Sequence, residues 1–232
     1  MLKNDLILRN PLRLMGNGAD RLFPDGGFGA VLARAGVGKT ALMVQLALES
    51  LLNERNVLHI GLDDPVEKVK LWYKEVFFNL SPGNPPSQMQ QLWENILPHR
   101  FIMTFRVEGF SVPKLEERLR DLSEQHIFVP EVIIFDGFPF EEDKEASLAQ
   151  LKAFSKHHRL CVWFSVRTHR HENTAPNGLP PQLAGVEHLF EAVIALQPDG
   201  EKIHIKALRG PGASAAGPAL RLDPATMLIV DD

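Results

Sequence analysis

A glycine-rich run combines the residue types that hold phosphate groups: Ala33-Arg34-Ala35-Gly36-Val37-Gly38-Lys39-Thr40. Gly36 and Gly38 let the backbone turn so that successive N–H groups face inward, and the positive end of a following helix points at the same place. Lys39 is expected to reach the β- and γ-phosphates, and the Thr40 hydroxyl is expected to bind Mg²⁺. The segment is therefore predicted to be a phosphate-binding loop (P-loop) for ATP and magnesium, with contacts from Ala33 to Ala41. Ala33 stands where the pattern has glycine.

A second magnesium ligand is predicted well beyond the P-loop. Four apolar residues, Val132 to Phe135, precede Asp136, which is the form of a Walker B strand. An aspartate at the carboxyl end of such a strand can hold Mg²⁺ through a water molecule. Many buried strands end in aspartate without this role, so the argument depends on the P-loop. Thr40 and Asp136 are the expected metal ligands.

Asp63 and Asp64 follow the second expected strand, residues 57–62. Parallel sheets bind ligands beyond the carboxyl ends of their strands, so a carboxylate here could orient or deprotonate an attacking water. The other interpretation is structural, because Asp64 precedes Pro65 and could cap a helix that has proline at its first position. Both interpretations stay open, and Asp63 is favoured over Asp64 as the catalytic residue.

Short apolar runs alternate with helical patterns along the chain. This alternation predicts an α/β fold with a mainly parallel sheet that is covered on both faces. A C-terminal hairpin that turns at residues 198–200 is expected to extend the sheet in antiparallel fashion. One domain is expected over residues 1–232, with a lead-in at 1–27 and a long polar loop at 166–183. Strands are expected at 29–33, 57–62, 101–105, 132–135, 160–165, 192–196, 202–207 and 227–230, and helices at 39–52, 65–79 and 88–97, with two more starting near 111 and containing 148.

The composition is that of a soluble globular protein, with 44% hydrophobic and 23% charged residues. No segment has the roughly 20 apolar residues that a membrane helix needs, and no signal peptide is expected, so the predicted location is cytoplasmic. The net charge of −4 gives no overall attraction to nucleic acid. The single cysteine, Cys161, lies in an apolar run and is expected to pack in the core.

With these motifs in this order, the chain resembles the RecA-like ATPases, especially the KaiC-like branch and its relatives RadA and DnaB. The resemblance runs from the P-loop strand through VLHIGLDDPVEKV, VIIFDG, CVWFSV and EAVIAL to KALRGPG. It implies a three-layer RecA-like P-loop NTPase fold and slow hydrolysis of ATP. We find no N/T-K-x-D element for guanine and no LSGGQ-type signature, which disfavours GTPases and ABC ATPases.

The resemblance also points to residues that follow core strands and act on the nucleotide in related proteins. KaiC-like proteins typically have two glutamates where this chain has Asp63 and Asp64, which are one methylene shorter. RadA and DnaB often carry a glutamine that senses the γ-phosphate, and Val166 lies near that position here. Arg167 or Thr168 could replace it, or the sensing residue could be absent.

A shared active site is a further implication of the resemblance. In KaiC-like rings a lysine and an arginine reach the nucleotide of the neighbouring subunit. Arg209 matches the arginine, whereas Ala207 occupies the place of the lysine and Lys206 precedes it. A homo-oligomer, which could be a ring, or a protein partner is therefore expected. A solvated arginine at a strand end is the alternative interpretation of Arg209.

A basic cluster opens the long polar loop: Arg167, His169, Arg170 and His171. RecA-like recombinases contact single-stranded DNA with loops in this region, but the cluster lacks interleaved aromatic residues for base stacking. A solvated loop or a contact on the nucleotide side is favoured over DNA binding. Three functions therefore follow from the sequence: an Mg-ATP-dependent ATPase, which is preferred; an ATP-binding regulatory or interaction module with little turnover; and a recombinase-like ATPase that binds single-stranded DNA.

Overall fold

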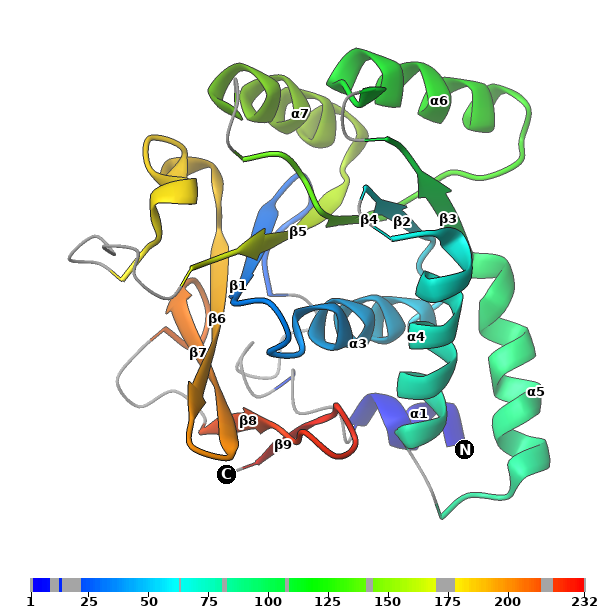
Figure 1. Ribbon diagram of the computed structural model, residues 1–232. Coiled ribbons are helices and arrows are strands. Elements are labelled where there is room, and N and C mark those ends of the chain that lie inside the picture. The colour runs from blue at the N-terminus through cyan, green and yellow to red at the C-terminus, as the bar shows by residue number, and fades with distance from the viewer. Residues whose placement is uncertain are drawn as a thin grey trace.

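A computed structural model describes residues 2–8, 13, 22–62, 64–80, 83–106, 109–140, 144–169, 178–213 and 219–231. Its strands are β1 (Phe28–Ala33), β2 (Val57–Gly61), β3 (Arg100–Thr104), β4 (Val132–Asp136), β5 (Cys161–Arg167), β6 (Ala192–Asp199), β7 (Lys202–Arg209), β8 (Leu220–Leu222) and β9 (Ile229–Asp231). They form one sheet in the order β3-β2-β4-β5-β1-β6-β7-β8-β9 (Figure 1). Strands β1 to β6 run parallel, and β7, β8 and β9 continue the sheet in antiparallel fashion. The predicted mainly parallel sheet with an antiparallel extension is confirmed.

Helices cover both faces of the sheet, which makes three layers (Figure 1). One face carries α1 (Leu2–Leu8), α3 (Lys39–Leu52), α4 (Val66–Asn79) and α5 (Pro86–Ile96), and the other carries α6 (Val112–Glu124) and α7 (Lys144–His158). Short 3-10 turns occur at Leu97–His99, Pro181–Leu183 and Glu187–Leu189. Within the described ranges, no helix has both the length and the apolar character needed to cross a membrane.

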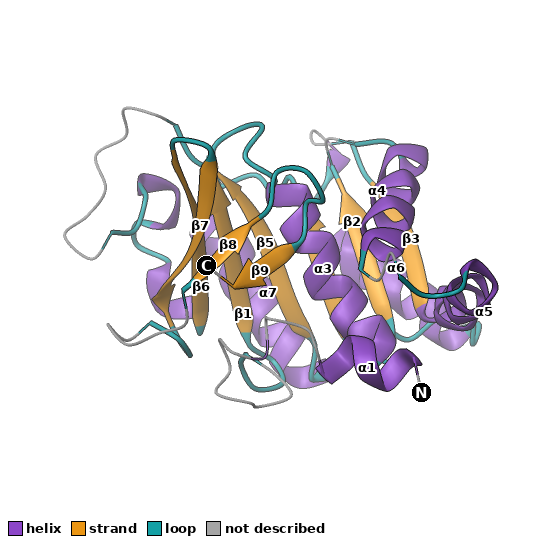
Figure 2. Cartoon of the chain, turned by 90° about the horizontal axis from the view of Figure 1, so that it is seen from below, coloured by secondary structure: helices purple, strands orange, loops and turns teal. Residues whose placement is uncertain are grey.

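Each face of the sheet has its own hydrophobic core, because successive strand residues point to opposite faces. On β1, Val31 and Ala33 pack in the core under α3, whereas Ala30 and Leu32 pack in the core under α6 and α7. The helix α3 is buried on nearly all sides, since it lies between the sheet, α4, α1 and the β8–β9 hairpin (Figure 2). The predicted core position of Cys161 is confirmed.

The hairpin differs in detail from its prediction. Strand β6 extends through Pro198 and Asp199, so the turn consists of Gly200 and Glu201. The ladder between β1 and β6 ends at Ala195, so beyond that residue β6 no longer has β1 as a neighbour. Pro198 is tolerated there because no hydrogen bond to β1 is lost when the backbone N–H is missing. The helix α1 and the three-residue strand β8 were not predicted.

Candidate phosphate site

The loop between β1 and α3 is the most exposed part of an otherwise buried segment. Strand β1 is fully buried, whereas Arg34, Ala35 and Gly36 are exposed before the chain enters α3 at Lys39. Gly36 has a φ of 77° and Gly38 a φ of 92°, a left-handed conformation that glycine adopts without strain. The predicted order of strand, glycine loop and helix is confirmed, with the helix bounds as expected.

The N–H groups at the start of α3 have no side-chain cap. The N-cap of this helix is Gly38, and its first turn has no acidic residue. The first N–H groups of a helix lack partners within the helix, and its dipole makes this end positive. The backbone of Lys39, Thr40 and Ala41 therefore suits a negatively charged group.

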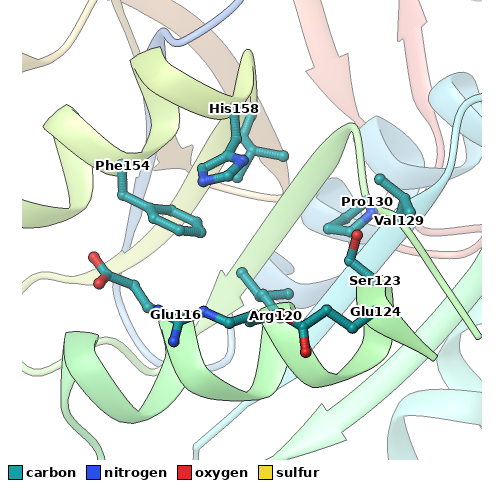
Figure 3. Close-up of a pocket in the computed structure, with 10 residues that line it drawn as sticks. Glu116, Arg120, Ser123, Glu124, Val129, Pro130, Phe154 and His158 are labelled. Carbon is teal, nitrogen blue, oxygen red and sulfur yellow. The ribbon is translucent and has the colours of Figure 1, made fainter. Parts of the chain in front are cut away.

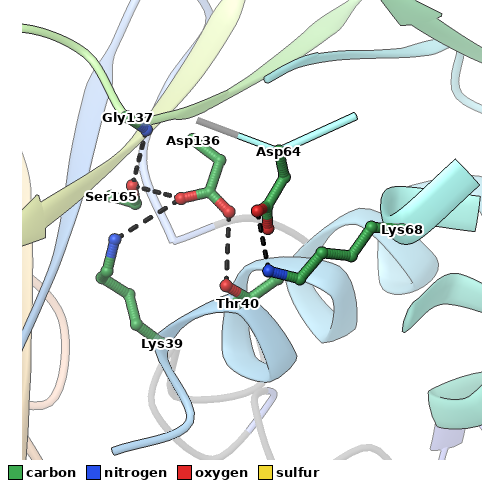
Figure 4. A network of polar contacts seen from close by, with 7 residues as sticks. All are labelled: Lys39, Thr40, Asp64, Lys68, Asp136, Gly137 and Ser165. Carbon is green, nitrogen blue, oxygen red and sulfur yellow. Dashed lines mark hydrogen bonds and ion pairs between the residues drawn. The ribbon is translucent and has the colours of Figure 1, made fainter. Parts of the chain in front are cut away.

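Asp136, at the end of β4, lies against the start of α3 (Figure 4). Its Oδ1 is 3.4 Å from Lys39 Nζ, and its Oδ2 accepts a hydrogen bond of 3.3 Å from Thr40 Oγ1. The structure thus brings together the three residues that the sequence assigned to the phosphate and the metal. They come from segments almost a hundred positions apart in the chain.

The charge of Asp136 is stabilised by its neighbours. Burial alone raises the pKa of this carboxyl, but the positive charge of Lys39 and the hydrogen bond from Ser165 lower it by more. The pKa therefore lies below its ordinary value. Asp136 is a carboxylate at neutral pH, which is the form that binds a hard divalent cation.

Ser165, on β5, is the site residue that the sequence analysis missed. Its buried hydroxyl donates to Asp136 Oδ1 at 2.5 Å and accepts a hydrogen bond of 3.0 Å from the Gly137 N–H (Figure 4). The neighbouring Val166, which was expected near a sensing position, is buried in the core under α6 and α7, on the other face of the sheet. Residue Ser165 follows the apolar run 160–164, and a polar residue ending such a run was the available signal.

Asp64 is not the helix cap that the sequence suggested. Helix α4 begins at Val66, and its N-cap is Pro65, with no side-chain cap. The Asp64 carboxylate instead forms an ion pair of 2.8 Å with Lys68, in the first turn of α4 (Figure 4). A residue four positions along a helix lies on the same side, so this pair replaces the expected cap. Asp63 lies outside the described residues.

Arg209 lies away from the P-loop of its own chain. It ends β7 and pairs with Val193, which in turn pairs with Ala30 in the first half of β1. The P-loop follows the other end of β1, at Ala33. The exposed guanidinium of Arg209 donates a hydrogen bond to the Glu187 carbonyl. Arg209 and Lys39 of one chain are therefore not brought together.

The basic cluster is described only in part. Arg167 is the exposed last residue of β5 and pairs with Ala33, directly before the P-loop. His169 is also exposed, whereas Arg170 and His171 lie outside the described residues. The predicted polar loop therefore begins two residues later than expected, after Arg167.

A buried histidine lies on the same face of the sheet as Asp136. His59 on β2 is fully buried, and its Nδ1 is 3.1 Å from the Tyr73 hydroxyl of α4. Burial lowers the pKa of His59 to about 4, against the opposing effect of the Asp136 charge. His59 is therefore neutral at neutral pH.

A hollow between α6 and α7 lies on the opposite face of the sheet (Figure 3). It is lined by charged residues such as Glu116 and Arg120, and by the rings of Phe154 and His158, whose centroids are 4.4 Å apart. The hollow shares no residue with the P-loop or with Asp136.

Comparison with known proteins finds no matching family model and no matching curated protein.

Proposed function

We propose that this chain binds Mg-ATP at the loop between β1 and α3 and hydrolyses it as a RecA-like ATPase. One observation carries the proposal: Lys39, Thr40 and Asp136 meet beside the uncapped start of α3. A cation for phosphate oxygens and two oxygen ligands for Mg²⁺ are thus together where backbone N–H groups favour an anion.

The residues present suit both groups. Thr40 Oγ1 and Asp136 Oδ2 are 3.3 Å apart, and hydroxyl and carboxylate oxygens are ligands that Mg²⁺ prefers. At Gly36, an added Cβ would have no atom of the described residues within 4 Å, so those residues leave space beside the loop backbone. When bound, Mg²⁺ would neutralise developing charge on the phosphate oxygens.

The chain's own residues have distinct tasks in this proposal. Lys39 would exchange its contact with Asp136 for one with the β- and γ-phosphates. Asp136 would keep its charge because the Ser165 hydroxyl remains bonded to it. Asp63 would orient the water. Arg209 would act on the nucleotide of a neighbouring subunit, since it lies far along the sheet from Lys39 of its own chain.

The RecA-like assignment belongs to the proposal as well. It is supported by the three layers, the mainly parallel sheet and its antiparallel extension, which are the architecture that the resemblance implies. The order of the P-loop, the Asp63-Asp64 pair, Asp136 and Arg209 along the chain supports it further.

A module that binds ATP with little turnover is the second candidate. It is favoured by the ion pair between Asp64 and Lys68, because Lys68 occupies Oδ1, one of the two Asp64 oxygens that could bind a water molecule. Of the two aspartates, Asp63 is then the one left to orient the attacking water.

Steady-state phosphate release separates the two candidates. An ATPase releases phosphate continuously, Lys39→Ala abolishes the release, and Asp63→Asn reduces it while ATP affinity is kept. Asp121→Asn is the matched control, because Asp121 is an exposed carboxylate on α6, ion-paired with Arg118. ATP binding without phosphate release in the unaltered chain would establish the regulatory module instead.

A further inference from the structure

The turn between β8 and β9, residues 223–228, lies directly against the start of α3 (Figure 2). Leu222 precedes this turn and is fully buried. A Cβ added at Gly38 would lie 2.3 Å from Leu222 Cδ2 and 3.7 Å from Met227 Sδ. Leu222 therefore closes one side of the P-loop at its last glycine.

Gln45 ties this turn and Ile229, the first residue of β9, to α3 through both ends of its amide. Its Nε2 donates to the Met227 carbonyl at 2.9 Å, and its Oε1 accepts from the Ile229 N–H at 2.9 Å. The side chain is 6% exposed, and Nε2 also lies 3.4 Å from the carbonyl of Ala41, in the first turn of α3. A buried amide is costly without partners, so these bonds favour one position of the turn relative to the helix.

The turn is also held internally and by a second helix. Asp223 accepts hydrogen bonds from the Thr226 hydroxyl at 2.7 Å and from the Ala225 N–H at 3.2 Å. Asn79, the last residue of α4, donates to the Thr226 carbonyl at 3.1 Å. The turn is thus fixed by hydrogen bonds to both α3 and α4.

We propose that Gln45 and Leu222 are positioning residues, through which the β8–β9 turn holds Gly38 in the conformation that points the P-loop N–H groups at phosphate. The inference rests on the proposed ATP site and adds a dependence of phosphate affinity on a distant hairpin. Because coupling between two sites is reciprocal, bound Mg-ATP must also stabilise the turn.

The test uses Gln45→Met, which keeps an unbranched side chain of similar size and removes the hydrogen bonds to Met227 and Ile229. If about one-tenth of the variant molecules keep the P-loop conformation that binds phosphate, the affinity for Mg-ATP falls about tenfold. Gln90→Met is the matched control, because Gln90 lies on α5 and its amide, among the described residues, bonds the exposed Glu94 side chain. The control is expected to bind Mg-ATP like the unaltered chain.

Hydrogen exchange gives a readout that a purely structural role would not change. In the unaltered chain, Mg-ATP is expected to slow exchange of the Met227 N–H, which donates to the Asp223 carbonyl within the turn and not to Gln45. Gln45→Met is expected to remove this effect. If Gln45→Met does not fold, Leu222→Ala takes its place, since it opens the space beside Gly38 and leaves the Gln45 bonds intact. A severalfold loss of affinity in folded Leu222→Ala supports the inference.

Two negative results are distinguishable. Unchanged Mg-ATP affinity in the folded variants, with no nucleotide effect on Met227 exchange, overturns the inference and leaves the proposed function standing. An unaltered chain that binds no Mg-ATP overturns the proposed function itself, and the coupling falls with it.

Discussion

Replacing Ser165 with alanine tests how the charge of Asp136 is maintained. The variant loses a hydrogen bond of 2.5 Å to a carboxylate and leaves the Gly137 N–H without its 3.0 Å acceptor. A hydrogen bond to a charged group contributes about 1.5–3 kcal/mol, and an unsatisfied donor costs about 1–3 kcal/mol when buried. Gly137 is only half-buried, so we expect a total loss of about 2–4 kcal/mol in the free energy of unfolding at pH 7.

The matched control is Ser155→Ala. Ser155 is fully buried on α7, and its Oγ has no hydrogen-bond partner among the described residues. Removing this hydroxyl is expected to be nearly neutral, because no bond is lost. Urea denaturation of both variants compares the loss of a bonded hydroxyl with the loss of an unbonded one.

The pH dependence of the Ser165→Ala effect follows from the lowered pKa of Asp136. A carboxyl whose pKa is lower in the folded state stabilises the fold above its unfolded pKa, which is about 3.9. That contribution is lost as the pH falls through the folded pKa. The difference between the unaltered chain and Ser165→Ala should therefore shrink below about pH 4. A Ser165→Ala variant as stable at pH 7 as Ser155→Ala would refute the reasoning.

Three further predictions concern the surrounding residues. His59 has an ordinary pKa of 6.5 and a folded pKa of about 4, so the unfolded chain binds more protons than the folded chain between these pH values. The free energy of unfolding should therefore fall by roughly 3 kcal/mol as the pH drops from 6.5 to 4. His59→Leu should flatten this pH dependence in urea denaturation. Asp64→Asn should lose the ion pair to Lys68 and leave phosphate release nearly intact, and a collapse of turnover would make Asp64 the catalytic carboxylate. Inactive Lys39→Ala and inactive Arg209→Ala chains should regain part of their activity when mixed, whereas a monomer with full turnover in Arg209→Ala would exclude a shared site.

Much of the phosphate site could be predicted because its parts are local in sequence. The glycine loop, Lys39 and Thr40 are contiguous, and an apolar run that ends at Asp136 marks a buried strand end. The contact between Ser165 and Asp136 could not be predicted, because it depends on β5 lying beside β4 in the sheet. Strand order is a tertiary property that periodicity does not reveal.

The errors at element ends have local physical causes. Asp64 before Pro65 has the form of a cap, but Pro65 itself takes the N-cap position and the carboxylate bonds Lys68 instead. The strand β8 has three residues, which is too short for a recognisable alternation. Its place beside β7 depends on pairing across the sheet, and Leu222 could therefore not be assigned to the P-loop from sequence.

Calorimetric titration with ATP and Mg²⁺ tests the central claim most directly. The unaltered chain and Lys70→Ala are expected to bind alike, because Lys70 is an exposed lysine on α4 that is paired with Glu67. Lys39→Ala should bind at least about tenfold more weakly, since a hydrogen bond to a charged group contributes about 1.5–3 kcal/mol. Equal affinity of Lys39→Ala and the unaltered chain would contradict the assignment of this loop as a phosphate site.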